Sequence, residues 1–114
     1  MTIGAYRFGQ IEIDGHVYTS DVIITPERVL DTWWRQEGHR LTIADLADVV
    51  AAKPDIVVVG TGYFGRMAVS EDARRYLEAH GIRVREARTR QAVQDFNQHQ
   101  EQRARVVAAL HLTC

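Results

Sequence analysis

The stretch D-I-V-V-V-G-T-G-Y-F-G-R-M, residues 55–67, joins an apolar run to a glycine-rich segment. The run from Ile56 to Val59 is continuous and β-branched, which is typical of a strand that is covered on both faces of a sheet. Gly60, Gly62 and Gly65 follow it in the spacing G-x-G-x-x-G, and an acidic residue, Glu86, comes about 20 positions later. This combination resembles the dinucleotide-binding fingerprint of α/β proteins.

The residues after the glycines do not fit a dinucleotide site. In a Rossmann unit the helix begins inside the motif, so its N–H groups face the pyrophosphate. Here the next helix-start signal is Ser70, and Glu71 and Asp72 in the first turn would repel a pyrophosphate. The chain is also too short for two mononucleotide-binding halves and a substrate domain. The sequence therefore favours a structural turn that could also serve as an anion nest.

Length and composition indicate one ordinary globular domain over residues 1–114. The chain is 46% hydrophobic and 25% charged, and its net charge is −1, which gives no electrostatic reason to expect nucleic acid or an anionic membrane as a partner. No apolar run reaches the roughly 20 residues of a membrane span, and the N-terminus lacks the pattern of a signal peptide. The single cysteine, Cys114, excludes an internal disulfide, so we expect a cytoplasmic protein.

Periodicity along the chain predicts an α/β fold. Residues 5–26 alternate as strands around a hairpin signal at Asp14-Gly15. From Thr42 onward, helical and strand patterns alternate. We expect helices from Thr42 to about residue 53, from Ser70 to His80 and from a Thr89 cap onward, with strands over 56–59, 82–86 and 106–112. The predicted architecture is a single three-layer domain, in which an N-terminal β-hairpin region precedes helices and strands on a central mixed sheet.

Five motifs occur in order along nearly the whole chain, and together they resemble the Mth938-like domain family. They are W-W-R-Q-E-G-H-R-L (33–41), V-V-G-T-G-Y-F-G-R-M-A-V (58–69), Y-L-E-A-H-G-I (76–82), T-x-x-A-x-x-x-F-N (89–97) and R-V-V-A-A-L-H-L-T-C (105–114). More distant relatives are the adipogenesis-associated Mth938 domain-containing protein and mitochondrial complex I assembly factor 3. The resemblance implies a single α/β domain with a mixed sheet and an unassigned role. It implies no catalytic residue and no cofactor.

The chain departs from the family pattern at two positions. His99 stands where the third helix usually has an apolar residue, and Arg103 stands where a glycine precedes the last strand. A left-handed helix stop at Arg103 would be unfavourable for a side chain with a Cβ.

Two segments supply the candidate ligand-binding residues. Backbone donors of Gly60, Thr61 and Gly62 lie at the carboxyl end of a predicted strand, where open α/β sheets bind ligands. Basic and aromatic side chains that could complete an anion site are Trp34, Arg35, His39 and Arg66. The alternative is that Trp33 and Trp34 pack in a strand, one toward the core and one over a sheet edge.

No catalytic or metal site is expected. His111 and Cys114 are three residues apart, so in a strand they point to opposite faces, and no further cysteine completes a zinc site. The favoured function is a non-enzymatic binding or assembly module that meets a protein partner. The alternative is a small anionic ligand, or a weak enzymatic activity, at the glycine loop. The last predicted strand, if exposed, would offer an edge for a homodimer.

Overall fold

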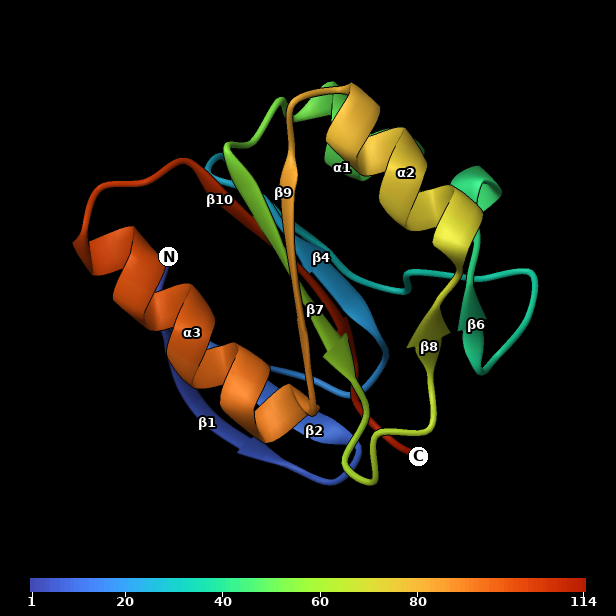
Figure 1. Cartoon of the computed structure of the whole chain (residues 1–114). Coiled ribbons are helices and arrows are strands. Elements are labelled where there is room, and N and C mark those ends of the chain that lie inside the picture. Colours follow the sequence, from blue (N-terminus) through green and yellow to red (C-terminus); the bar gives the residue numbers. More distant parts are fainter.

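The computed structural model describes all 114 residues, Met1–Cys114 (Figure 1). Strands and helices alternate after an N-terminal all-β region. The strands are β1 (Ile3–Arg7), β2 (Gln10–Ile13), β3 (His16–Tyr18), β4 (Val22–Ile24), β5 (Val29–Leu30), β6 (Arg40–Leu41), β7 (Ile56–Thr61), β8 (Ala68–Val69), β9 (Arg83–Ala87) and β10 (Val106–His111). The helices are a 3-10 turn (Ile43–Asp45), α1 (Ala47–Ala51), α2 (Glu71–Ala79) and α3 (Thr89–Glu101). None of them is long and apolar enough to cross a bilayer.

A five-stranded mixed sheet in the order β5-β4-β10-β7-β9 forms the centre of the fold. β10, β7 and β9 are parallel, whereas β4 is antiparallel to β10 and to β5. The predicted central mixed sheet is therefore confirmed. The last strand is not an exposed edge that could pair with a second copy, because β10 lies between β4 and β7 and is buried along its whole length. The edges of this sheet are β5 and β9.

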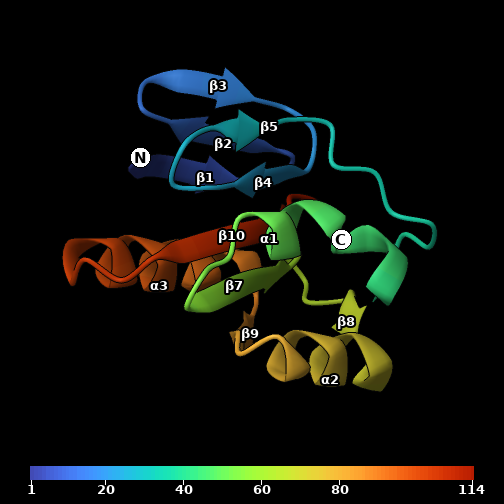
Figure 2. The ribbon, with the colours of Figure 1, turned by 90° about the horizontal axis from the view of Figure 1, so that it is seen from above.

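Both faces of the central sheet carry a hydrophobic core, as the continuous apolar run at 56–59 predicts. Ile56 and Val58 belong to a cluster that includes Phe96 of α3 and residues of β1 and β2. Val57 and Val59 belong to a second cluster on the other face, with residues of α1 and α2. The separate sheet β1-β2-β3 and helix α2 consequently lie at opposite ends of the view in Figure 2.

Local signals explain most element boundaries. Asp14 and Gly15 both have positive φ, 50° and 82°, and form the two-residue turn between β2 and β3. Ser70 caps α2, since its hydroxyl accepts a hydrogen bond from the Ala73 N–H at 3.1 Å. The helix expected from Thr42 is divided into the 3-10 turn and α1. Trp33 lies in the loop between β5 and β6, so the prediction of a strand there is wrong.

The third helix ends on a left-handed turn at Arg103, although the sequence makes such a turn unfavourable there. Arg103 has φ 63°, and the Ala104 N–H donates to the His99 carbonyl while the Arg103 N–H donates to the Gln100 carbonyl. These two bonds form a Schellman motif, whose left-handed position usually holds glycine. An arginine side chain at this position costs about 1 kcal/mol or more.

Replacing Arg103 by glycine is expected to stabilise the fold. Relief of the left-handed strain should raise the free energy of unfolding by about 1 kcal/mol, measured as a higher midpoint of urea unfolding. Gln102→Gly is the matched control, because Gln102 has φ −79° and a glycine there only adds backbone freedom. Equal effects of the two substitutions would contradict this account.

Candidate functional site

The glycine loop, defined here as residues 60–67, is bonded to the rest of the protein through its own backbone. Its amides face the C-terminal segment, residues 112–114, and the start of α3. The bonds run from Gly62 N to Thr89 Oγ1 (2.8 Å), Tyr63 N to the Thr113 carbonyl (2.6 Å), Gly65 N to the Gly62 carbonyl (3.2 Å), Arg66 N to the Cys114 carbonyl (3.0 Å) and Met67 N to the Thr61 carbonyl (3.0 Å). In this conformation these donors satisfy the protein's own carbonyls and hydroxyls.

Each glycine of the G-x-G-x-x-G pattern has a neighbour that a side chain would disturb. A Cβ on Gly60 would lie 2.7 Å from Thr89 Oγ1, and one on Gly65 would lie 3.1 Å from Cγ of Arg88. A Cβ on Gly62 would lie 2.5 Å from the backbone of Cys114. The spacing is thus explained by packing within the domain. The carboxylate of Glu86 also has a partner within the chain, since it accepts a hydrogen bond from Arg74 at 2.7 Å.

Thr89 joins three segments at the carboxyl end of the sheet. The prediction that it caps α3 is wrong, because Arg88 holds the cap position and Thr89 is the first helical residue. Its hydroxyl instead accepts from Gly62 N and donates to the His111 carbonyl at 2.6 Å. Both bonds are buried, so one hydroxyl fixes the glycine loop against the end of β10.

We expect Thr89→Val to destabilise the domain by about 2 kcal/mol. The substitution keeps the shape but leaves a buried N–H and a buried carbonyl without a partner. Thr89→Ser is the control, since it keeps the hydroxyl and loses one methyl group, worth about 0.8 kcal/mol. Chemical denaturation of the two variants should separate these values, and a valine variant as stable as the serine variant would refute the role of the hydroxyl.

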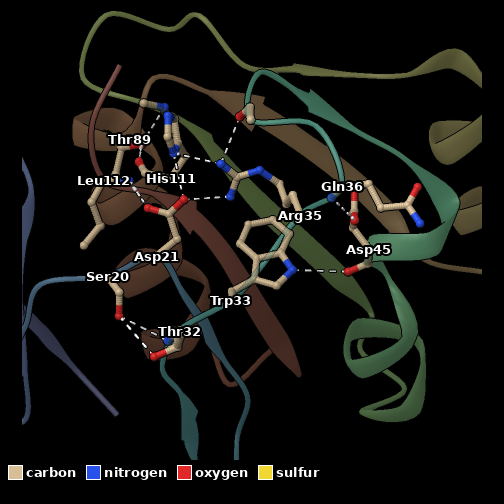
Figure 3. Close-up of polar contacts among 12 residues, drawn as sticks. Ser20, Asp21, Thr32, Trp33, Arg35, Gln36, Asp45, Thr89, His111 and Leu112 are labelled. Carbon is tan, nitrogen blue, oxygen red and sulfur yellow. Dashed lines mark hydrogen bonds and ion pairs between the residues drawn. The ribbon is translucent and has the colours of Figure 1, made fainter.

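A buried cluster of Asp21, Arg35 and His111 lies beside this junction (Figure 3). Asp21 precedes β4, Arg35 lies in the loop between β5 and β6, and His111 ends β10. Arg35 Nη1 donates to Asp21 Oδ2 at 2.7 Å, and His111 Nδ1 lies 2.8 Å from the same oxygen. The second carboxylate oxygen accepts from the Leu112 N–H at 2.8 Å. The cluster therefore ties the N-terminal half of the chain to the C-terminal segment.

The carboxylate of Asp21 fixes the protonation of the cluster. Burial alone would raise the pKa of Asp21, but hydrogen bonds from His111, from the Leu112 N–H and from Arg35 outweigh it, so this pKa is lowered from 3.8. Because an ionised carboxylate only accepts, His111 carries a proton on Nδ1. Arg35 Nη2 donates to the Gly38 carbonyl at 2.9 Å. Nε of Arg35 and Nε2 of His111 are buried without a hydrogen-bond partner in the protein.

The lowered pKa of Asp21 predicts how stability depends on pH. A carboxyl whose pKa is lower in the folded state stabilises the fold fully above its unfolded value, 3.8, and this contribution is lost as pH falls below it. We therefore expect urea unfolding between pH 6 and pH 2.5 to show a decline in stability that is steeper for the natural chain than for Asp21→Asn. Parallel pH profiles of the two proteins would contradict this expectation.

The structure places the two segments that supply the predicted ligand-binding residues, the Trp33–His39 segment and the glycine loop, close to each other. β6 and β8 pair in parallel, and the Ala68 N–H donates to the His39 carbonyl at 3.0 Å, which places the Trp33–His39 segment beside the end of the glycine loop. The rings of His39 and His111 are 6.1 Å apart. Arg66 is exposed, whereas Arg35 is buried and already paired with Asp21.

The two tryptophans have different environments. Trp33 is half-buried, its indole N–H donates to the Asp45 carbonyl at 3.2 Å, and its ring lies under the Arg35 guanidinium at 4.9 Å. Trp34 is 74% exposed and borders a small hollow of about 180 Å³ together with Trp33. Gly60, Gly62 and Arg66 line neither this hollow nor four others of about 110–450 Å³ on the surface.

An exposed aromatic face lies on the glycine loop, and the sequence analysis did not identify it. It consists of Phe8, Tyr63 and Phe64, which are 50%, 37% and 54% exposed. Their ring centroids are 5.1–6.0 Å apart. Tyr6 lies next to this face, with its ring centroid 6.4 Å from that of Tyr63. Burial raises the pKa of Tyr6 to about 12, so its hydroxyl stays protonated and donates to the Leu112 carbonyl. The only sequence signal was the pair Tyr63-Phe64 between two glycines, where a core residue is not expected.

Known proteins resemble the chain over almost its full length. A family model described as "Protein of unknown function (DUF498/DUF598)" matches residues 3–111. The conserved hypothetical protein PH1505 from Pyrococcus horikoshii OT3 has 26% identity and a TM-score of 0.81, with 100% of each chain covered. A protein from Bordetella parapertussis has 28% identity and a TM-score of 0.84, covering 97% of this chain and 94% of that one. A Bordetella pertussis protein described as a Mth938-like domain has 24% identity and a TM-score of 0.80, covering 97% and 85%.

Proposed function

Since the chain belongs to the DUF498/DUF598 family of Mth938-like domains, a family of unknown function, we propose that it is a non-enzymatic binding or assembly module that meets a protein partner through the aromatic face. The observation that carries this proposal is the exposure of Phe8, Tyr63 and Phe64 as one contiguous group. Exposed aromatic clusters are unfavourable in water and are enriched at the centres of protein interfaces.

The construction of the glycine loop supports a docking role. The loop is anchored by backbone bonds to the C-terminal segment and by Thr89, so its aromatic side chains are held in place rather than free to collapse. A rigid anchor loses little conformational entropy when a partner binds. We place this module in the cytoplasm, because the chain has a single cysteine.

Site-specific photo-crosslinking in cells tests the proposal. Phe64 is replaced by p-benzoyl-phenylalanine in one variant, and Val17, which is 54% exposed on β3, in a matched control. A third variant carries the crosslinker at Trp34, the exposed residue of the other predicted segment. We expect one discrete heavier species from position 64 and none from position 17. Equal labelling at all three positions, or none at 64, would overturn the proposal.

A small anionic ligand is the second candidate. The observation that favours it is the pair of buried nitrogens without partners, Nε of Arg35 and Nε2 of His111, close to His39. A ligand present at 100 times its dissociation constant would stabilise the fold by about 2.7 kcal/mol. Thermal unfolding with phosphate, sulfate and small carboxylates measures this, and Arg66→Ala tests whether the exposed arginine contributes. No shift with any of these anions would remove this candidate.

A further inference from the structure

Arginines surround the aromatic face. The Arg90 guanidinium lies 5.6 Å from the centroid of the Tyr63 ring. The side chain of Arg88 packs over Gly65, so that a Cβ there would meet its Cγ at 3.1 Å. Arg66 directly follows Gly65 in the glycine loop. Arg66, Arg88 and Arg90 are all exposed. The turn after β1, the glycine loop and the first turn of α3 lie at the same end of the molecule in Figure 1.

None of these three arginines takes part in an ion pair within the chain. The ion pairs of the protein use Arg35, Arg74, Arg75, Arg85 and Arg105. The first turn of α3 contains no acidic residue, although a carboxylate would be favourable there and arginines are not. The chain as a whole has a net charge of −1, so this concentration of unpaired positive charge is local. An anionic partner would satisfy it.

From this arrangement we infer that the aromatic face binds an acidic segment of a protein partner, whose carboxylates face Arg66, Arg88 and Arg90 while an apolar side chain contacts the rings. The inference rests on the proposed function and adds the chemistry of the partner. Guanidinium groups pair with carboxylates in bidentate geometry. Aromatic side chains and arginines are also the residues most enriched at interface centres.

The geometry favours a protein over a single-stranded nucleic acid. Nucleic acid platforms present open ring faces on which successive bases stack. Here Phe8 and Tyr63 meet at 71° and Tyr63 and Phe64 at 74°, so the rings pack edge against face. Arg90 covers a face of Tyr63 as well.

Synthetic peptides provide the direct test. Three fluorescein-labelled 12-residue peptides share a central phenylalanine and differ in their flanking residues, which are glutamate, glutamine or lysine. Fluorescence anisotropy should show binding of the glutamate peptide alone, weakened by added salt. The Arg88→Glu/Arg90→Glu variant should lose about tenfold or more in affinity. Arg28→Glu/Arg83→Glu changes the net charge equally at other exposed arginines and should bind like the natural chain. Tighter binding of a labelled oligo-dT, or no preference for the glutamate peptide, would overturn the inference.

The crosslinking variant at Phe64 separates this inference from the proposed function. If Arg88→Glu/Arg90→Glu abolishes the discrete species formed at position 64 and Arg28→Glu/Arg83→Glu does not, the partner is acidic as inferred. If the species persists in both backgrounds, the aromatic face binds a partner whose recognition does not depend on these arginines, and only the inference fails. If no species forms in the natural background, the proposed function itself fails.

Discussion

Replacing Gly62 by alanine is expected to destabilise the domain by about 3 kcal/mol or more. Gly62 has φ +107°, where an L side chain is strained, and its Cβ would lie 2.5 Å from the carbonyl carbon of Cys114. The obstructing atoms are backbone, so relief requires the C-terminal segment to move and its bonds to Tyr63 and Arg66 to lengthen. For a domain near this size the loss corresponds to a fall in melting temperature of roughly 10 °C or more, which calorimetry measures directly.

Gly15→Ala is the matched control for this prediction. Gly15 also has positive φ, +82°, but nothing lies within 4 Å of its Cβ position. Its replacement measures the backbone strain alone, about 1 kcal/mol. In a chain that lacks residues 113–114 the two alanine substitutions should cost the same, because the obstructing carbonyls are gone. A Gly62 variant that is as stable as the Gly15 variant in the complete chain would show that the close approach is unimportant.

The sequence predicts the elements well where local signals and tertiary context agree. The apolar run 56–59, the Ser70 cap and the Asp14-Gly15 turn each produce the expected element. Two features depend on contacts between distant segments rather than on local signals. The position of the last strand, between β4 and β7, is a matter of topology that no periodicity specifies. Thr89 has the character of a helix cap, but its hydroxyl bonds residues 27 and 22 positions away in the sequence.

The candidate site is predictable only in part, because its contacts join distant segments. The sequence suggests that Arg35 and His39 lie near the glycine loop. In the structure the His39 carbonyl accepts from Ala68, just past that loop, whereas Arg35 contacts Asp21, Gly38 and His111. The sequence does not reveal Asp21 and His111, which are 90 positions apart and meet only when β4 and β10 pair. The G-x-G-x-x-G spacing is equally ambiguous, because glycine serves close backbone packing as readily as it serves a phosphate.

Loss of the Asp21 charge is expected to have the second large effect on stability. In Asp21→Asn one of the two carboxylate oxygens is replaced by an NH₂ group. The Leu112 N–H requires the remaining oxygen, so the amide nitrogen must face Arg35 and His111. The nitrogen would then face the guanidinium of Arg35, which can only donate, and the buried guanidinium would lose its counter-charge. Removing one partner of a buried ion pair costs about 3–5 kcal/mol, which urea unfolding at pH 7 should show. Because the cluster fixes Leu112, the amides of Tyr63 and Arg66, bonded to the same C-terminal segment, should also exchange faster with solvent deuterium.

The exposed ion pair of Glu71 and Arg75 is the control for this expectation. Its two groups are 3.6 Å apart on the surface of α2, with about two thirds of each side chain in water. Solvent screens such a pair, so Glu71→Gln should change the free energy of unfolding by no more than about 0.5 kcal/mol. Each substitution removes one carboxylate opposite one arginine, so the contrast measures what burial and the added bonds of Asp21 to His111 and to the Leu112 N–H contribute. If both variants lost equally little stability, the buried cluster would not hold the C-terminal segment in place, and the rigidity of the aromatic face would need another source.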